Sequence, residues 1–399
     1  MEESFKHSID EEAYEALSSL PANPFHRYIE HDSRRAAFEQ QEFETNGHTP
    51  LFTYREASKL DVAHYLARLQ TIEEQLPKLC HHEPIVEDLY RGKIDELRIR
   101  AALVKAVQAQ DDESVTALSE QLFSPPVQTR EELEKELSTM IAADKPLFVH
   151  KKTVSRDLFL LMLQTILSHY EMTDWRIGST KGLSVRLKHG HPNKQALVLV
   201  PDAFQISKNR AIELLTHEIE VHALRTHNGR LSPFLLLGRG LDRYIDTEEG
   251  LAIHMQRKWK TSETSHLPGF WDAYATVLTM EYSFKEVYET LRIARTTLAR
   301  KAGHIEPERV GRNAAWRLCM RAYRGIHQTS KKGVGYRRDH IYRSGLLRMR
   351  HALAQDPLLI DTLFQGNMGL QHVERVKQLN LSTSRAPEWV SKAVVQSLV

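Results

Sequence analysis

Apolar residues recur at helical spacing through most of the first 145 residues. Three segments place an apolar side chain every three or four positions: Asp61 to Gln70, Ile94 to Gln108 and Ser114 to Leu122. Asp111 provides a start signal before the last of these segments, and Thr129 with Glu132 forms a capping box for a further helix. The pattern therefore predicts a helical N-terminal region over residues 1–145.

A different pattern follows a predicted helix around Ser155 to His169. Short, partly β-branched runs alternate with turn-like stretches at residues 179–182 and 190–193. The runs are Trp175 to Gly178, Leu183 to Leu187 and Ala196 to Pro201. Their length and spacing predict a small antiparallel sheet.

Helical spacing returns directly after this sheet. A helix is predicted from about Lys208 to Thr226, ending at the C-terminal signal Asn228-Gly229. From Thr247 onward the chain is again helical in pattern, with Ser283 and Glu286 as another capping box. We expect a mostly helical α+β fold, in which residues 146–399 form the second region.

Composition indicates a globular protein in a reducing compartment. Hydrophobic residues make up 41% of the 399 residues and charged residues 27%, which is typical of a folded chain with a large core. The two cysteines, Cys80 and Cys319, argue against a disulfide framework, so we expect a cytoplasmic protein. Cys80-His81-His82 could bind a metal, but a helix end is the favoured interpretation.

The sequence shows no membrane or export signal. Its best apolar run, Leu158 to Leu163, is ended by Gln164 and is far too short to cross a membrane. Residues 1–6 are acidic and lack an apolar stretch, so no signal peptide is expected.

Charge is distributed very unevenly along the chain. Residues 1–150 contain 16 Lys/Arg and 29 Asp/Glu, a net charge of −13, whereas residues 300–350 contain 14 Lys/Arg and three acids, a net charge of +11. A solvated or internally paired basic face is the simplest interpretation. The alternative is a field that attracts an acidic partner, either a peptide tail or nucleic acid. Nucleic acid is not expected, because no recognised nucleic-acid motif accompanies the aromatic residues interleaved there.

Three residues that suit a hydrolytic metal site lie close together in the predicted helix 208–226. His217, Glu218 and His222 occur in the segment Thr-His-Glu-Ile-Glu-Val-His. Imidazoles bind zinc, and a neighbouring carboxylate can take a proton from water activated by the metal. Ordinary surface histidines on an amphipathic helix are the alternative. We favour the metal site because an acid directly follows the first histidine.

The spacing of the two histidines makes a further structural prediction. Residues five apart on an ideal α-helix lie about 140° apart around its axis, so their side chains do not converge. A π-bulge has a wider turn and would return the fifth residue to nearly the same face. If the site exists, the helix should be widened between His217 and His222, with Glu218 pointing beside the metal.

A catalytic zinc needs a third protein ligand. Glu248 and Glu249 are the main candidates, and His227 and His254 are weaker ones. Thr247 is predicted to cap a helix that starts with both acids, although acids are also simply favourable at a helix start.

Several segments resemble the QEGLA-motif family, which includes the microtubule-associated tyrosine carboxypeptidases. They are His-Glu-x-x-x-His, Glu-Gly-Leu-Ala about thirty residues later, Asn228-Gly229, Arg321-Ala-Tyr-Arg-Gly325 and Asp339-His-Ile-Tyr-Arg-Ser-Gly345. The likeness runs from about Thr49 to about Leu381. It implies a metallopeptidase that removes a C-terminal Tyr or Phe, with His217, His222 and Glu249 as zinc ligands and Glu218 as the catalytic base.

The chain departs from the family pattern at two places. Glu220-Val221 stands where the family often has Gly-Thr, which removes an easy source of backbone freedom at the expected bulge. Glu248 stands where the family often has Gln, so the identity of the carboxylate ligand is open to either neighbour.

A carboxypeptidase must also bind the free C-terminus of its substrate. Arginine does this well through a bidentate fork, and Arg317, Arg321 and Arg324 recur at helical spacing. Arg324 is our first choice for this clamp, followed by Arg321; a solvated basic face is the alternative. Tyr342 is the first choice for a donor to the developing oxyanion, the alternative being a half-buried aromatic with a hydrated hydroxyl.

These observations predict a zincin-like core within the α+β fold, by analogy with the order of a small sheet before the metal helix. We expect a zinc carboxypeptidase that acts on the aromatic C-terminus of a peptide or protein, with an acidic tail as a candidate substrate. Two alternatives are a metallohydrolase of other specificity, such as an endopeptidase or amide hydrolase, and a non-catalytic module that binds through its basic 300–350 face.

Overall fold

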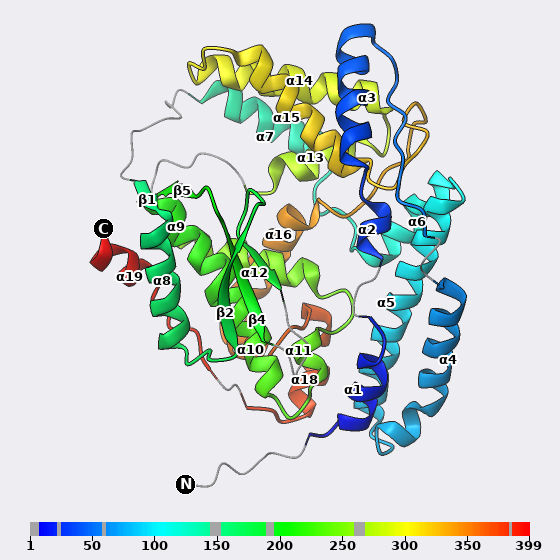
Figure 1. The fold of residues 1–399 in the computed structure, drawn as a ribbon, viewed down its shortest axis with the longest axis vertical. Helices are drawn as coiled ribbons and strands as arrows, with labels where there is room; N and C mark the ends of the chain where they lie inside the picture. The colour runs from blue at the N-terminus through cyan, green and yellow to red at the C-terminus, as the bar shows by residue number, and fades with distance from the viewer. Residues whose placement is uncertain are drawn as a thin grey trace.

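Helices make up most of the structure, as the sequence predicts (Figure 1). The computed structural model describes residues 8–21, 25–57, 61–143, 153–188, 195–258, 268–382 and 385–399. The predicted region boundary near residue 145 and the predicted turn at 190–193 lie outside these ranges. No helix among the described residues is long and apolar enough to cross a membrane.

Among the described residues, seven helices precede the first strand, and α1 to α6 lie on the right of the molecule in Figure 1. They are α1 (Glu11–Ser18), α2 (His26–Ile29), α3 (Ser33–Asn46), α4 (Val62–Leu79), α5 (Pro84–Gln108), α6 (Asp112–Leu122) and α7 (Arg130–Ala142). The predicted start signals are confirmed, since Asp111 caps α6 and Thr129 forms a capping box with Glu132 in α7. Buried Cys80 ends α4, as expected of a helix end.

The strands among the described residues form two small sheets. Strands β1 (Thr153–Ser155) and β5 (Gln205–Ser207) pair antiparallel, and the second sheet has the order β2 (Trp175–Thr180), β4 (Ala196–Pro201), β3 (Arg186–Lys188). The prediction of a purely antiparallel sheet is wrong, because β2 pairs parallel with β4 and only β3 is antiparallel to it. Strand β4 has buried alternate residues and takes the central position, so the chain passes from β2 to the far side of β4 before returning.

Helix α8 (Arg156–His169) lies beside this sheet, and the helix that follows β5 carries the histidines (Figure 1). It is continuous through α9 (Lys208–Leu215), the π-helical segment η1 (Thr216–Ala223) and α10 (Leu224–Leu231). The predicted stop at Asn228-Gly229 is wrong. Gly229 instead lets the helix pass close to the backbone of Leu237 and Gly238, where a β-carbon would clash.

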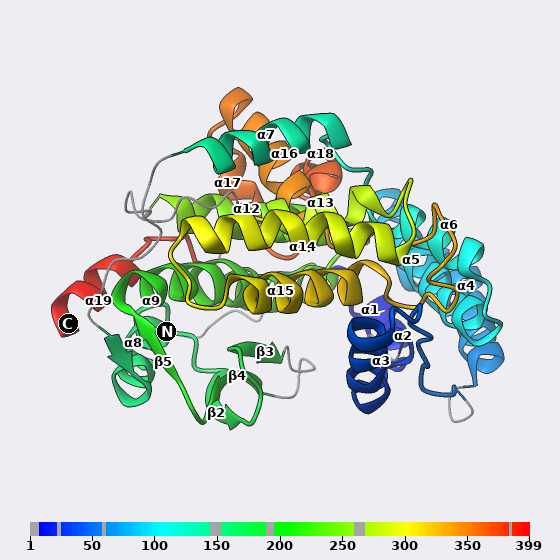
Figure 2. The same cartoon turned by 90° about the horizontal axis from the view of Figure 1, so that it is seen from above.

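The remaining elements are helical. They are α11 (Leu236–Arg239), α12 (Ile245–Arg257), α13 (Phe270–Leu278), α14 (Phe284–Lys301), α15 (Pro307–Ala322), α16 (Ile341–Gln355), α17 (Leu359–Leu363), η2 (Leu370–His372), α18 (Val373–Gln378) and α19 (Ser391–Leu398). Helices α14 and α15 run side by side across one face (Figure 2), and the predicted capping box of Ser283 and Glu286 begins α14. The prediction that Thr247 caps α12 is wrong, since α12 starts at Ile245 and the Thr247 hydroxyl accepts from the amide of Leu370.

Two hydrophobic clusters stabilise the part of the fold that the structure describes. One joins α1, α4 and α5 to the β2–β4–β3 sheet and to α8 through α11, and the other joins α3 and α5 through α7 to α13 through α15. Each cluster contains residues from both sides of position 145. Helix α12 packs on η1 on one side and on α16 on another, so it connects the histidine helix with the helices of the basic segment.

Candidate metal centre and active site

The wider turn of η1 brings His217 and His222 together. Their ring centroids are 4.7 Å apart, although the residues are five positions apart in sequence. The widening predicted from that spacing is therefore confirmed, and it forms without the glycine expected at Glu220. Glu220 points away from the histidines, because its buried carboxylate accepts from the Tyr170 hydroxyl and the Ser391 amide.

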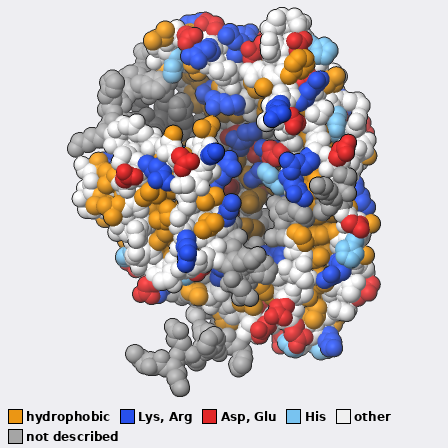
Figure 3. Space-filling model, in the orientation of Figure 1, with side chains coloured by type: hydrophobic (Ala, Val, Ile, Leu, Met, Phe, Trp, Pro, Cys, Tyr) orange, Lys and Arg blue, Asp and Glu red, His pale blue; other side chains and the backbone are white. Residues whose placement is uncertain are grey.

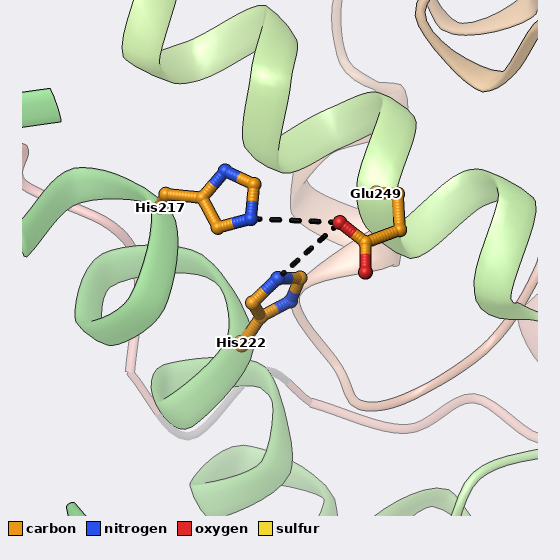
Figure 4. A group of neighbouring side chains, drawn as sticks. All are labelled: His217, His222 and Glu249. Carbon is orange, nitrogen blue, oxygen red and sulfur yellow. Dashed lines mark ion pairs between the residues drawn. The ribbon is translucent and has the colours of Figure 1, made fainter. Parts of the chain in front are cut away.

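Glu249 of α12 faces both imidazoles (Figure 4). Its Oε2 lies 3.5 Å from His217 Nε2 and 3.8 Å from His222 Nε2, and one ligand atom of each residue lies within 4.8 Å of the others. Oε2 is fully buried and makes no hydrogen bond among the described residues. Two imidazoles and one carboxylate are a donor set used by catalytic zinc, so this group could hold a metal.

Each histidine is oriented through its other ring nitrogen. His217 Nδ1 lies 3.0 Å from Gln256 Oε1, and His222 Nδ1 lies 2.6 Å from Glu248 Oε1. These contacts favour the tautomer that donates from Nδ1 and leaves the Nε2 lone pair directed at the centre of the group.

Glu248 and Glu249 therefore have different environments, although they are neighbours on α12. The second oxygen of Glu248 bonds to Arg225, which is completely buried and also donates to the carbonyls of Leu363, Gly366 and Met368. Glu248 is thus committed to supporting His222, and Glu249 is the carboxylate that faces the histidines. His227 pairs with Asp174 at 2.8 Å and His254 is not in the group.

A pocket of about 240 Å³ opens beside His217. Its lining includes Glu218, Gln256, Asp272, Arg321 and Tyr342, with apolar walls from Leu214, Ile253 and Pro268. The Glu218 side chain makes no hydrogen bond or ion pair among the described residues, so its carboxylate is available to a substrate or water in this pocket. Figure 3 shows a hollow on this face of the molecule with Lys and Arg side chains around it.

Arg321 forms the ion pairs that line one side of this pocket. This guanidinium pairs with Asp272 and with buried Asp339, both at 2.9 Å, and it lies over the ring of Tyr342. Burial and the nearby Glu249 carboxylate raise the pKa of Tyr342 to about 12, so its hydroxyl is protonated at neutral pH and can donate a hydrogen bond.

Comparison with known protein families shows which family the chain belongs to. A sequence model of the family described as microtubule-associated tyrosine carboxypeptidase matches residues 36–397. The chain belongs to this family. A comparison with curated proteins finds no significant match. Membership in the family places the protein among the carboxypeptidases and confirms the resemblance that its motifs carry.

The structure brings together most of the candidate residues of this carboxypeptidase. Arg321 and Tyr342 line the pocket of Glu218, as a shared site requires. Arg324 does not line it, because its side chain pairs with Glu30 at 3.1 Å in a neighbouring pocket that shares only Arg321 with the first. Arg317 is exposed and donates to the carbonyl of Asn313 on its own helix.

Three residues of the site were missed by the sequence reasoning. Arg225 and Gln256 support the ligands, and Arg338 approaches Glu249 closely enough to interact with its charge. The available signal was position: Arg225 lies three residues after His222, and Arg338 lies four residues before Tyr342. Helical spacing of this kind places side chains near one another, but it does not say which partner they meet.

Proposed function

We propose that this protein is a zinc-dependent carboxypeptidase that removes a C-terminal Tyr or Phe from peptides or proteins. The convergence of His217, His222 and Glu249 beside the free carboxylate of Glu218 carries the proposal. The fully buried, unsatisfied Oε2 of Glu249 supports a cation there, and the donor set suits zinc. A small sheet followed by the metal helix supports a zincin-like core by analogy.

A zinc ion in this site would supply a Lewis acid that polarises the scissile carbonyl and makes water more acidic. Glu218 takes the water proton as the new carbon–oxygen bond forms and passes it to the leaving amine as the carbon–nitrogen bond breaks. The Tyr342 hydroxyl donates to the negative charge that develops on the carbonyl oxygen. Gln256 and Glu248 keep the two imidazoles oriented during these steps.

The basic 300–350 segment supports an acidic substrate. Its positive charge would attract an acidic protein tail over a distance of about one Debye length, which is roughly 8 Å at physiological salt. The family is described as microtubule-associated, and we propose a protein C-terminus on such a partner as the physiological class of substrate.

A peptide library with free C-termini tests the function. Purified protein loaded with zinc should release terminal Tyr or Phe, detected by mass spectrometry, and should spare the same peptides with amidated ends. Glu218→Gln should keep its zinc and lose turnover by at least about a hundredfold, the scale of general-base loss. Cleavage within the amidated peptides would indicate an endopeptidase. Unchanged activity in Glu218→Gln, with zinc retained, would mean that another group takes the proton.

A further inference from the structure

An acidic side chain that the proposed mechanism does not use lies in the pocket of Glu218. Asp272 lines this pocket together with Arg321 and Tyr342, and it comes from the first turn of α13. Gly269 directly precedes this helix with a φ of +70°, and it packs so closely on the backbone of Tyr342 that a β-carbon would clash there. The start of α13 is thereby fixed against the start of α16, so Asp272 and the proposed oxyanion donor have fixed positions in one pocket.

The two aspartates that pair with Arg321 do so differently. Asp339 is almost completely buried and accepts a hydrogen bond from Nε of Arg321. Oδ1 of Asp272 is buried 2.9 Å from Nη1 of Arg321, but the side chain as a whole is 20% exposed. No other residue that the structure describes donates a hydrogen bond to either carboxylate oxygen of Asp272. Asp272 therefore keeps acceptor capacity that a ligand in the pocket can use.

This arrangement leaves one negative charge in excess, because one guanidinium faces two carboxylates. Burial raises the pKa of Asp272 to about 6, so the group is mostly ionised at neutral pH. The other cation of the lining, Arg210, pairs with Glu213 at 2.9 Å and is largely exposed to solvent. A substrate carboxylate is disfavoured beside Asp272, and a substrate cation beside Arg321. A neutral group that donates a hydrogen bond satisfies both.

The remaining walls of the pocket suit an aromatic ring. Leu214, Ile253 and Pro268 provide apolar surface, and the volume of about 240 Å³ is sufficient for a tyrosine side chain. Because Glu218 must reach the water that attacks the scissile carbonyl, a side chain bound here belongs to a residue next to the scissile bond. An acidic residue preceding that bond fits poorly beside the excess negative charge, whereas an uncharged terminal aromatic residue fits well.

We propose that Asp272 accepts a hydrogen bond from the phenolic hydroxyl of the C-terminal residue and so makes the enzyme prefer Tyr to Phe. The inference rests on the proposed carboxypeptidase function and names the residue that determines its specificity. A hydroxyl bonded to a carboxylate forms a stronger hydrogen bond than a neutral pair does. Phe would contact the same apolar walls, but it would displace water from Asp272 and leave the carboxylate without a donor, which is costly.

Peptides that differ only in their last residue test this role. With zinc-loaded protein at neutral pH, kcat/KM is measured for peptides ending in Tyr, Phe, Lys or 4-aminophenylalanine, whose amino group donates in place of the hydroxyl. Wild type should prefer Tyr to Phe by about 10- to 100-fold, the scale of a hydrogen bond to a charged group. It should also cleave the 4-aminophenylalanine peptide faster than the Phe peptide.

Two variants of Asp272 should change this ratio. Asp272→Ala should bring the Tyr-to-Phe ratio to within a few-fold of one, mainly through a loss on the Tyr peptide, because no acceptor remains. Asp272→Asn should have an intermediate ratio, since its amide oxygen is a weaker, neutral acceptor. Glu308→Gln is the matched control, because Glu308 is an exposed acid that also pairs with an arginine, and it should keep the wild-type ratio.

Each outcome has a distinct meaning. Zinc content and thermal unfolding are measured for every variant, so a folding defect in Asp272→Ala would appear as an equal loss on all peptides, and Asp272→Asn then decides. A wild-type ratio near one, or a preference for terminal Lys, would overturn the role of Asp272 without any variant. A Tyr preference that persists in both folded variants would also overturn it and leave the proposed function intact.

A second series of peptides places Tyr or Phe at the penultimate position with a constant last residue. A preference that follows the penultimate residue would show that the pocket binds the preceding side chain, which would overturn the assignment to the terminal one. A zinc-loaded wild type that releases no terminal residue from any peptide would overturn the proposed function together with this inference.

Discussion

Glu248 is the residue whose substitution most sharply separates a metal ligand from its support. It joins His222 to Arg225, and only 7% of its side chain is exposed, whereas that of Arg225 is completely buried. Glu248→Gln keeps the shape of the side chain and removes the negative charge between an imidazole and a guanidinium. We expect two separate losses, one in metal affinity and one in stability.

The magnitudes follow from these contacts. Loss of a hydrogen-bonding partner behind a metal ligand typically weakens metal binding by about 10- to 100-fold, or about 1.4–2.7 kcal/mol. Breaking a buried ion pair from one side typically costs about 3–5 kcal/mol. Arg225 keeps its three carbonyl acceptors, so we expect a loss of about 3 kcal/mol in the free energy of unfolding.

The assay separates the two effects. Zinc affinity is measured by competition with a chromophoric chelator, and the stability of the zinc-free protein by urea unfolding. Glu249→Gln is the informative comparison, because it should lose stoichiometric zinc without the stability loss that comes from Arg225. Glu374→Gln, an exposed helical acid, should match wild type in both measurements.

Two results would refute these assignments of Glu248 and Glu249. Glu248→Gln without bound zinc, together with Glu249→Gln at full occupancy, would make Glu248 the ligand. Full stability of zinc-free Glu248→Gln would show that the carbonyl acceptors alone satisfy Arg225.

Two further predictions concern the basic face formed by residues 300–350 and the close contact between α12 and α16. Arg324→Ala should change kcat/KM on neutral peptides only a few-fold, because Arg324 is paired with Glu30, and it should mainly slow the capture of acidic peptides at low salt. If the variant instead lost its selectivity for peptides with a free C-terminal carboxylate, Arg324 would be the residue that binds that carboxylate. Gly250→Ala should lower the free energy of unfolding by about 1–3 kcal/mol, the usual range for overpacking, because its β-carbon would clash with the backbone of Gly345. Gly182→Ala is the control, because its β-carbon would meet only side-chain atoms of Thr180 and Arg186, none closer than 3.3 Å. Equal urea midpoints for both variants would show that the close contact with Gly345 does not limit stability.

The histidine site was the most predictable part of the molecule. Two imidazoles five residues apart cannot converge on an ideal helix, so their chemistry predicted a wider turn, and η1 has that turn. Helix starts were predictable for the same reason, because Asp111 and Thr129 cap through local hydrogen bonds that depend only on nearby sequence.

Features set by distant contacts were not predictable in this way. Parallel pairing of β2 with β4 depends on the path of the chain around the sheet, and short runs with turn residues between them resemble consecutive hairpins equally well. Gly229 resembled a helix end, but its role is a close approach to a segment eight residues later. The partner of Arg324, Glu30, likewise comes from another element, and helical spacing within one segment cannot identify it.

The close contact between α12 and α16 explains why residues from two distant sequence motifs meet at the proposed metal site. Glu249 and Gly250 are adjacent, so α12 directs the carboxylate toward His217 while the glycine lets the helix pass against Gly345. That close contact fixes the start of α16, and with it Tyr342, beside the proposed metal site. A glycine in each motif is therefore a requirement of the active-site geometry, because a side chain at either position would move the oxyanion donor away from the ligand.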